Sequence, residues 1–103
     1  MDILIRIKRL VIEDKLYFTQ KAADEMDRDG LKNWIVKEAI LNAPAIAKKL
    51  RSKNPITGVR EYLYVIVGLT YDGIPVYTKG KISNLGGREV FYVLISSKRS
   101  MPS

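Results

Sequence analysis

The chain has 103 residues, of which 47% are hydrophobic and 28% are charged, a composition typical of one globular domain with a single core. It contains no cysteine and no histidine, so a thiolate nucleophile, a disulfide, a histidine general base and a histidine metal ligand are all excluded. We therefore expect no metal and no cofactor. The lack of cysteine and of an apolar run of roughly 20 residues predicts a cytoplasmic protein that does not enter a membrane.

The net charge of +7 is concentrated in the C-terminal part of the chain. Residues 1–43 carry eight basic and eight acidic side chains, whereas residues 44–103 carry ten basic side chains and three acidic ones. A one-sided positive field favours a nucleic acid or another acidic partner over a neutral metabolite. On charge alone, a basic surface that only keeps the protein in solution is an equally good interpretation.

Helical periodicity dominates the N-terminal part of the chain. Apolar residues recur at helical spacing over residues 2–13 and again over residues 31–43, where Pro44 ends the pattern. Between them, Thr19 is the expected N-cap of a further helix that ends near Gly30. We therefore expect three amphipathic helices before the sheet begins.

Period-two patterns, which are typical of strands, follow the helices. Strands are predicted over residues 60–70, 76–82 and 88–99. Turn chemistry at Asp72-Gly73 and at residues 83–87 makes neighbouring strands antiparallel, and residues 45–53 fit either a fourth strand or a ragged helix end. The expected fold is α+β, a single domain over residues 1–103 in which N-terminal helices pack on one face of a three- to four-stranded antiparallel sheet.

The alternation also predicts which face of the sheet is buried. The apolar sets of the first and last of these strands are expected to face the helices, namely Leu63, Val65, Val67, Leu69, Phe91, Val93 and Ile95. The other face would gather aromatic and basic side chains: Arg60, Tyr62, Tyr77, Lys79, Lys81 and Lys98. Such a face suits single-stranded RNA, because bases stack on tyrosine and cations neutralise phosphates. The alternative is an ordinary surface, since both residue types are common on exposed strands.

Two stretches of the sheet region, REYLYVIVGLTYDGIPVYTKGKI (residues 60–82) and EVFYVLISSKR (residues 89–99), resemble the small RelE-fold toxins. The resemblance is to the MqsR-type proteins and the related DUF4258 domains in particular. The segments IKRLVIEDKLYFTQKAADEM (residues 7–26) and IVKEAILNA (residues 35–43) are similar to the opening helices of that group. The resemblance therefore extends over most of the chain.

This resemblance implies a RelE-like fold and the toxin of a type II toxin–antitoxin system. Such a protein is an mRNA endoribonuclease that needs no metal and uses the RNA 2′-hydroxyl as nucleophile. Its partners would be mRNA, free or on the ribosome, and a cognate antitoxin protein. The resemblance implies that Lys98 stabilises the phosphorane charge, that Tyr77 donates or relays a proton, and that Lys79 or Lys81 holds the scissile phosphate. The expected RNA-binding residues are Arg60, Tyr62, Lys81 and Arg99.

The chain also departs from the pattern of this group at two positions. The MqsR-type strand glutamine has no counterpart, because the only glutamine is Gln20, and Lys21 stands where DUF4258 domains carry a histidine. The alternative function is therefore a non-catalytic RNA- or protein-binding module with the same fold. A third reading is a small structural protein whose basic face has no ligand.

Overall fold

The computed structural model describes residues 2–100, in which three N-terminal helices pack against a five-stranded, mostly antiparallel sheet. The elements along the chain are α1 (Ile3–Ile12), β1 (Leu16–Phe18), α2 (Gln20–Asp29), α3 (Asn33–Asn42), β2 (Lys48–Lys53), β3 (Arg60–Leu69), β4 (Pro75–Leu85) and β5 (Arg88–Arg99). The predicted α+β class, with the helices first and the main strands after them, is confirmed.

The strand order in the sheet is β1-β5-β4-β3-β2, with β1 parallel to β5 and every other pair antiparallel. The four antiparallel strands β2 to β5 agree with the predicted sheet, in which residues 45–53 were one of two alternatives for the fourth strand, but the fifth strand, the parallel β1, was not predicted. β1 has only three residues, too few to show a period, and β2 has the sequence KKLRSK, whose charges conceal the alternation of a strand.

The helix ends predicted at Thr19 and Gly30 are confirmed. The hydroxyl oxygen of Thr19 accepts a hydrogen bond from the backbone N–H of Ala22 at 3.2 Å, and Gly30 ends α2 with a left-handed φ of 71°. Asp2 caps α1 in the same way, because its carboxylate accepts a hydrogen bond from the N–H of Leu4 at 2.9 Å. These caps fix where the helices begin, and so which of their side chains face the sheet.

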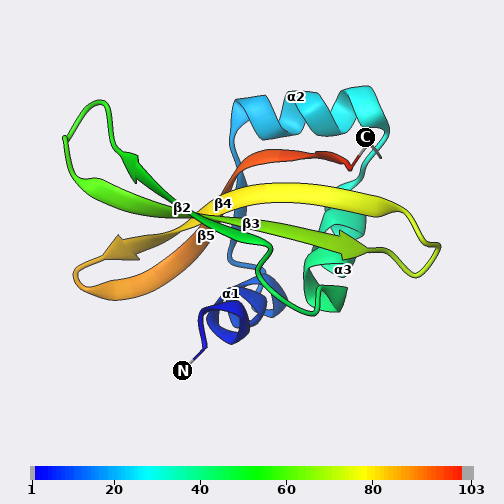
Figure 1. Cartoon of the computed structure of the whole chain (residues 1–103), viewed down its shortest axis with the longest axis horizontal. Coiled ribbons are helices and arrows are strands. Elements are labelled where there is room, and N and C mark those ends of the chain that lie inside the picture. The colour runs from blue at the N-terminus through cyan, green and yellow to red at the C-terminus, as the bar shows by residue number, and fades with distance from the viewer. Residues whose placement is uncertain (1, 101–103) are drawn as a thin grey trace.

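The helices bury their apolar sides in one core on one face of the sheet. The largest fully buried apolar side chains of this core are Ile7, Val36, Ile40, Ile66, Val76, Tyr92 and Leu94. In Figure 1, β3 and β4 cross in front of α3, while α2 runs along the upper edge of the sheet. A Cβ atom on Gly68 of β3 would lie 1.8 Å from the carbonyl oxygen of Ala39 in α3, so this close approach requires glycine. No helix of residues 2–100 buries its apolar side on the other face of the sheet, which we call the open face.

The side of β3 that packs on the helices is opposite to the predicted one. Tyr64 and Ile66 lie in the core, whereas Val65 and Val67 share the open face with their partners on β4. The prediction fails because the middle of β3 is apolar on both faces, so the alternation alone does not identify the buried one. Gly68 is the informative residue, since it shares a face with Tyr64 and Ile66 and marks the side that α3 approaches.

The buried side of β5 is also opposite to the predicted one in the first half of the strand. Tyr92 and Leu94 are 0% exposed and lie in the core, whereas the predicted core residues Phe91, Val93 and Ile95 are only partly buried. The run is apolar on both faces here as well. By contrast, the faces predicted for β4 agree with its burial pattern.

A β-bulge at Ile95 reverses the alternation of β5. Lys79 of β4 lies opposite Ser96, but the next residue of β4, Gly80, lies opposite Leu94. Ile95 is therefore an extra residue in β5, with no partner of its own on β4. The residues of β5 after the bulge exchange faces relative to those before it.

Candidate nucleic-acid interface

The three predicted catalytic residues, Tyr77, Lys79 and Lys98, lie together on the open face. Tyr77 and Lys98 are direct partners across the β4–β5 ladder, and Lys79 follows two positions after Tyr77 on the same side of β4. The ammonium nitrogen of Lys98 lies 5.5 Å from the centroid of the Tyr77 ring, which is within the range of a cation–π contact. Neither lysine forms an ion pair within residues 2–100, so both charges are available to an anion.

The bulge is the reason that Lys98 reaches the open face. In an uninterrupted strand, Lys98 would point to the same side as the buried Leu94, because the two residues are four positions apart. With Ile95 as an extra residue, Ser97 turns inward and is 0% exposed, while Lys98 stands beside Tyr77. The period-two pattern of the sequence does not predict that the residues after Ile95 exchange faces.

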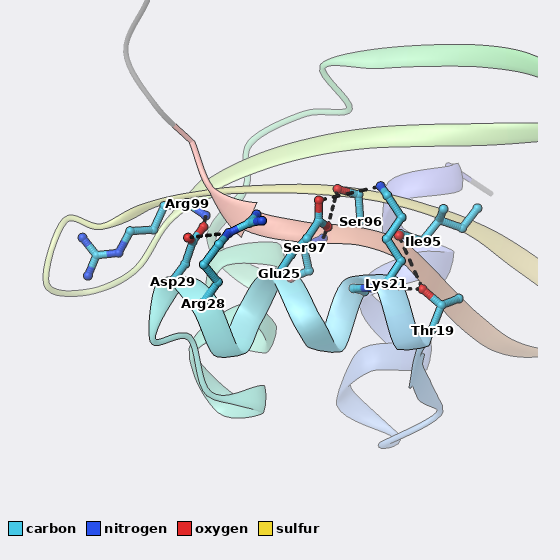
Figure 2. A network of polar contacts seen from close by, with 10 residues as sticks. Thr19, Lys21, Glu25, Arg28, Asp29, Ile95, Ser96, Ser97 and Arg99 are labelled. Carbon is cyan, nitrogen blue, oxygen red and sulfur yellow. Dashed lines mark hydrogen bonds and ion pairs between the residues drawn. The ribbon is translucent and has the colours of Figure 1, made fainter.

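A buried carboxylate on α2 holds the segment of β5 next to Lys98. Glu25 accepts hydrogen bonds from the Ser96 hydroxyl at 2.8 Å and from the backbone N–H of Ser97 at 3.1 Å (Figure 2). Burial raises the pKa of Glu25, but the bonds from Ser96 and Ser97 and the charges of Lys21 and Lys98 outweigh it, so the pKa lies below its usual value. Glu25 is therefore ionised near neutral pH and fixes the backbone on which Lys98 stands.

Other α2 contacts continue this support along the outer edge of β5. The backbone N–H and the hydroxyl of Thr19 donate to the carbonyl oxygens of Leu94 and Ile95 at 3.0 and 3.4 Å. The carboxylate of Asp29 accepts a hydrogen bond from the backbone N–H of Arg99 at 2.9 Å. Beyond the short β1, α2 thus takes the place of a neighbouring strand and occupies backbone groups that an edge strand would expose.

Arg99, a predicted RNA-binding residue, does not join the three residues on the open face. It lies opposite Val76, which faces the core, whereas its neighbour Lys98 lies opposite Tyr77. In Figure 2 the side chain of Arg99 points away from α2, and the residue is exposed. Its guanidinium is therefore separated from Lys98 by the plane of the sheet.

The surroundings of Tyr77, Lys79 and Lys98 on the open face are apolar and aromatic. Val67 and Val65 of β3 are the direct partners of Tyr77 and Lys79. At the β1 edge of the same face, the rings of Tyr17 and Phe91 meet edge to face with centroids 4.7 Å apart, and Tyr17 is 56% exposed. Lysines above apolar neighbours are less hydrated than lysines among polar ones, which strengthens their attraction to a phosphate.

Lys81 lies on the same side of β4, but its charge is already paired. Its ammonium nitrogen lies 3.2 Å from a carboxylate oxygen of Glu61, which also accepts a hydrogen bond from the side chain of Asn54 at 3.1 Å. The bond from Asn54 and the contact with Lys81 lower the pKa of Glu61 despite its partial burial. Of the predicted phosphate-holding lysines, Lys79 is thus the unpaired one and Lys81 the paired one.

Arg60 and Tyr62 lie on the helix side of the sheet, not on the open face as predicted. They alternate with Glu61 and continue the side of β3 to which Tyr64 belongs, and their partners on β2 are Lys53 and Arg51. The Tyr62 ring lies 4.1 Å from the ammonium nitrogen of Lys49 and 6.0 Å from the guanidinium carbon of Arg51. The sequence prediction of the site missed three cations, although their alternate spacing was visible: Lys49, Arg51 and Lys53.

A pocket of about 440 Å³ lies where β3 and the β4–β5 hairpin separate. Its walls include Arg60, Tyr62 and Lys81, three of the predicted RNA-binding residues. An ion pair between Arg6 of α1 and Glu89 of β5 forms another part of the wall. The predicted site is therefore divided between the open face and this second region.

Within residues 2–100, no group of three or more aspartate and glutamate side chains is placed to hold a metal ion. None of the helices in that range has the length and apolar character needed to cross a membrane.

Comparison with known proteins gives no match: no protein-family model, no curated protein and no solved structure is similar to this chain.

Proposed function

We propose that this protein is an endoribonuclease that cleaves single-stranded RNA on its open face without a metal. The observation that supports the proposal most directly is the position of Lys98. The bulge at Ile95 sets its unpaired ammonium group beside Tyr77 and near Lys79, next to the apolar side chains of Val65 and Val67 on β3. Two unpaired cations and a phenol are groups that can bind a phosphodiester and stabilise its transition state.

In the proposed reaction, the 2′-hydroxyl oxygen attacks the adjacent phosphorus and the bond from phosphorus to the 5′ oxygen breaks. Lys79 and Lys98 offset the charge on the non-bridging oxygens, and the Tyr77 hydroxyl donates its proton to the departing 5′ oxygen. The proton of the 2′-hydroxyl passes to water or to a phosphate oxygen. The products are a 2′,3′-cyclic phosphate and a 5′-hydroxyl end.

The resemblance to RelE-fold toxins agrees with this chemistry and extends the proposal. On that basis the substrate is mRNA, free or on the ribosome, and the activity is controlled by an antitoxin protein that binds the toxin. The order of three helices and the main strands, with a β-sheet left open on one side, is compatible with a RelE-like fold. Expression of the protein without its antitoxin should then arrest growth.

The second candidate is a non-catalytic RNA-binding module. One observation favours it: the carboxylate of Glu25 is already occupied. The charge of Lys98 helps to lower the pKa of Glu25, but this carboxylate accepts hydrogen bonds from Ser96 and Ser97. This carboxylate is 9% exposed and is not placed to act as a general base. A module of this kind would bind RNA in a salt-dependent way and produce no new RNA ends.

Incubation of the purified protein with a mixed-sequence RNA in the presence of EDTA separates the two candidates. The proposed ribonuclease generates fragments with 5′-hydroxyl ends, which polynucleotide kinase can label directly. A Lys32→Ala variant, changed at an exposed lysine away from both regions, should cleave like the unchanged protein. If the protein cuts neither free RNA nor ribosome-bound mRNA, the cleavage proposal is wrong and RNA binding is the remaining candidate.

A further inference from the structure

A second strongly basic surface lies outside the proposed catalytic face. It is formed by β2 and the start of β3 on the helix side of the sheet, and we call it the basic arm: Lys49, Arg51, Lys53, Arg60 and Tyr62. All five residues are exposed, and none of its four cations forms an ion pair within residues 2–100. Four unopposed charges on so small an area repel one another, which is unfavourable unless an anion binds there.

We propose that the basic arm binds the phosphate backbone of a single-stranded RNA segment, independently of the open face. The inference goes beyond the proposed cleavage reaction, because the arm contains none of its catalytic residues and lies on the other side of the sheet. The basic arm would then contribute to the affinity for RNA, and the open face would cleave the RNA.

The arrangement of the cations fits an extended nucleic acid strand. Lys49, Arg51 and Lys53 occupy every second position of β2, so successive cations are two positions apart, about 6.6 Å along the strand. Arg60 pairs with Lys53 across the ladder and widens the row at its end. A row of evenly spaced cations can follow successive phosphates, whereas a folded acidic protein would require matching shape as well as charge.

An aromatic ring lies within this row. Tyr62 is 44% exposed although Lys49 contacts its ring at 4.1 Å, so part of the ring is accessible to a base. Stacking of bases on tyrosine between cations is the common mode of single-strand binding. An acidic peptide would gain little from such a ring, and this difference favours RNA as the occupant.

The neighbouring acidic groups do not neutralise the arm. Glu61 is engaged by Lys81 and Asn54 on the other side of β3, and Glu89 is engaged by Arg6. The pocket of about 440 Å³ begins at Arg60 and Tyr62, so the arm ends at a cavity large enough for part of a nucleotide. The arm and the pocket together form one continuous surface for a polyanion.

The test is RNA binding by fluorescence anisotropy with a labelled oligouridine in which every 2′-hydroxyl is methylated. This probe lacks the nucleophile, so it measures binding even if the protein cleaves RNA. The arm variant is Lys49→Gln, Arg51→Gln and Lys53→Gln, and the matched control, which loses the same charge elsewhere, is Arg9→Gln, Lys15→Gln and Lys32→Gln. Thermal unfolding monitors whether each variant is folded, and Arg51→Gln alone replaces the triple arm variant if that one is not.

The slope of log affinity against log salt concentration is negative, and loss of three phosphate contacts should reduce its magnitude by about 2. Binding at low salt should weaken at least roughly tenfold. The control should keep the slope of the unchanged protein. The proposal is overturned if both triple variants lose affinity equally, or if polyglutamate of the same length binds as tightly as the oligouridine. Because the methylated oligouridine cannot be cleaved, absence of cleavage and absence of arm binding are separate results.

Discussion

Lys98 and Tyr77 face each other across the β4–β5 ladder, with 5.5 Å between the ammonium nitrogen and the centroid of the ring, only because β5 contains an extra residue at Ile95. Without that residue, Lys98 would point towards the helices and away from Tyr77. A bulge that re-aims a side chain next to a candidate site is a common feature of functional sheets. The pair therefore provides the most specific test of how the open face works.

Replacement of Tyr77 by phenylalanine removes the proposed proton donor but keeps the ring beside Lys98. We expect the RNA cleavage rate to fall by about 100-fold or more, because a positioned acid typically contributes that amount. Affinity for the methylated oligouridine and the midpoint of urea unfolding should stay unchanged, since the ring and its contact remain. A cleavage rate within a factor of two of the unchanged protein would remove Tyr77 from the reaction.

Ser96 and Ser97 are adjacent but should respond in opposite ways to alanine substitution. The Ser96 hydroxyl donates to Glu25 at 2.8 Å, so Ser96→Ala should cost about 1.5–3 kcal/mol of the free energy of unfolding. The hydroxyl of Ser97 is buried and has no hydrogen-bond partner within residues 2–100, so Ser97→Ala should be neutral or stabilising. Urea unfolding of the two variants measures the difference, and equal destabilisation would contradict the contact with Glu25.

The stability of the protein should depend on the ionisation of Glu25. Its pKa in the folded protein is lower than the usual value of 4.5, so the folded state holds fewer protons in this range than the unfolded state. The contribution is therefore complete above the unfolded pKa and is lost as the pH falls through the folded pKa. Glu25→Gln should lower the free energy of unfolding near neutral pH, and its difference from the unchanged protein should shrink at acidic pH.

That pH dependence is measured by urea unfolding at neutral pH and at several values below 4.5. Asp24→Asn, which removes a negative charge from an exposed position of the same helix, serves as the control for a general effect of charge. A stability difference between Glu25→Gln and the unchanged protein that is the same at every pH would contradict the assignment.

The ion pair between Glu61 and Lys81 should limit the affinity of the protein for RNA. Its two side chains are 27% and 29% exposed, so the pair is partly screened by solvent and worth about 0.5–1 kcal/mol. Glu61→Gln releases the charge of Lys81, and we expect binding of the methylated oligouridine to tighten about two- to fivefold. Weaker binding, measured by anisotropy, would mean that Glu61 itself contacts the ligand or positions the β2–β3 segment.

The sequence predicted the parts of the fold that have a local cause. Thr19 and Gly30 mark the ends of α2 through their own hydrogen-bonding and backbone preferences, and the alternation of β4 is polar on one face only. The faces of β3 and β5 could not be predicted, because both strands are apolar on both sides at their centres. For β3, the close packing of α3 at Gly68 decides which side is buried.

The candidate site was predicted in part for a related reason. Tyr77 and Lys79 belong to the strand whose faces are unambiguous, so their common location follows from the sequence. Lys98 reaches the same face only through the bulge, which depends on how β5 fits against β4 and α2. Arg60 and Tyr62 were assigned to the wrong face together with the rest of β3, and the cations of β2 were left out of the site because residues 45–53 fitted a ragged helix end as well as a strand.

The central claim is most directly tested by comparing the unchanged protein with Lys98→Ala. Each protein is incubated with single-stranded RNA in the presence of EDTA, and the ends of the RNA fragments are mapped. The proposal predicts fragments with 5′-hydroxyl ends from the unchanged protein and a rate at least roughly 100-fold lower for Lys98→Ala, while both proteins unfold at the same urea concentration. Equal cleavage by the two proteins, or no cleavage of free or ribosome-bound RNA by the unchanged protein, would contradict it.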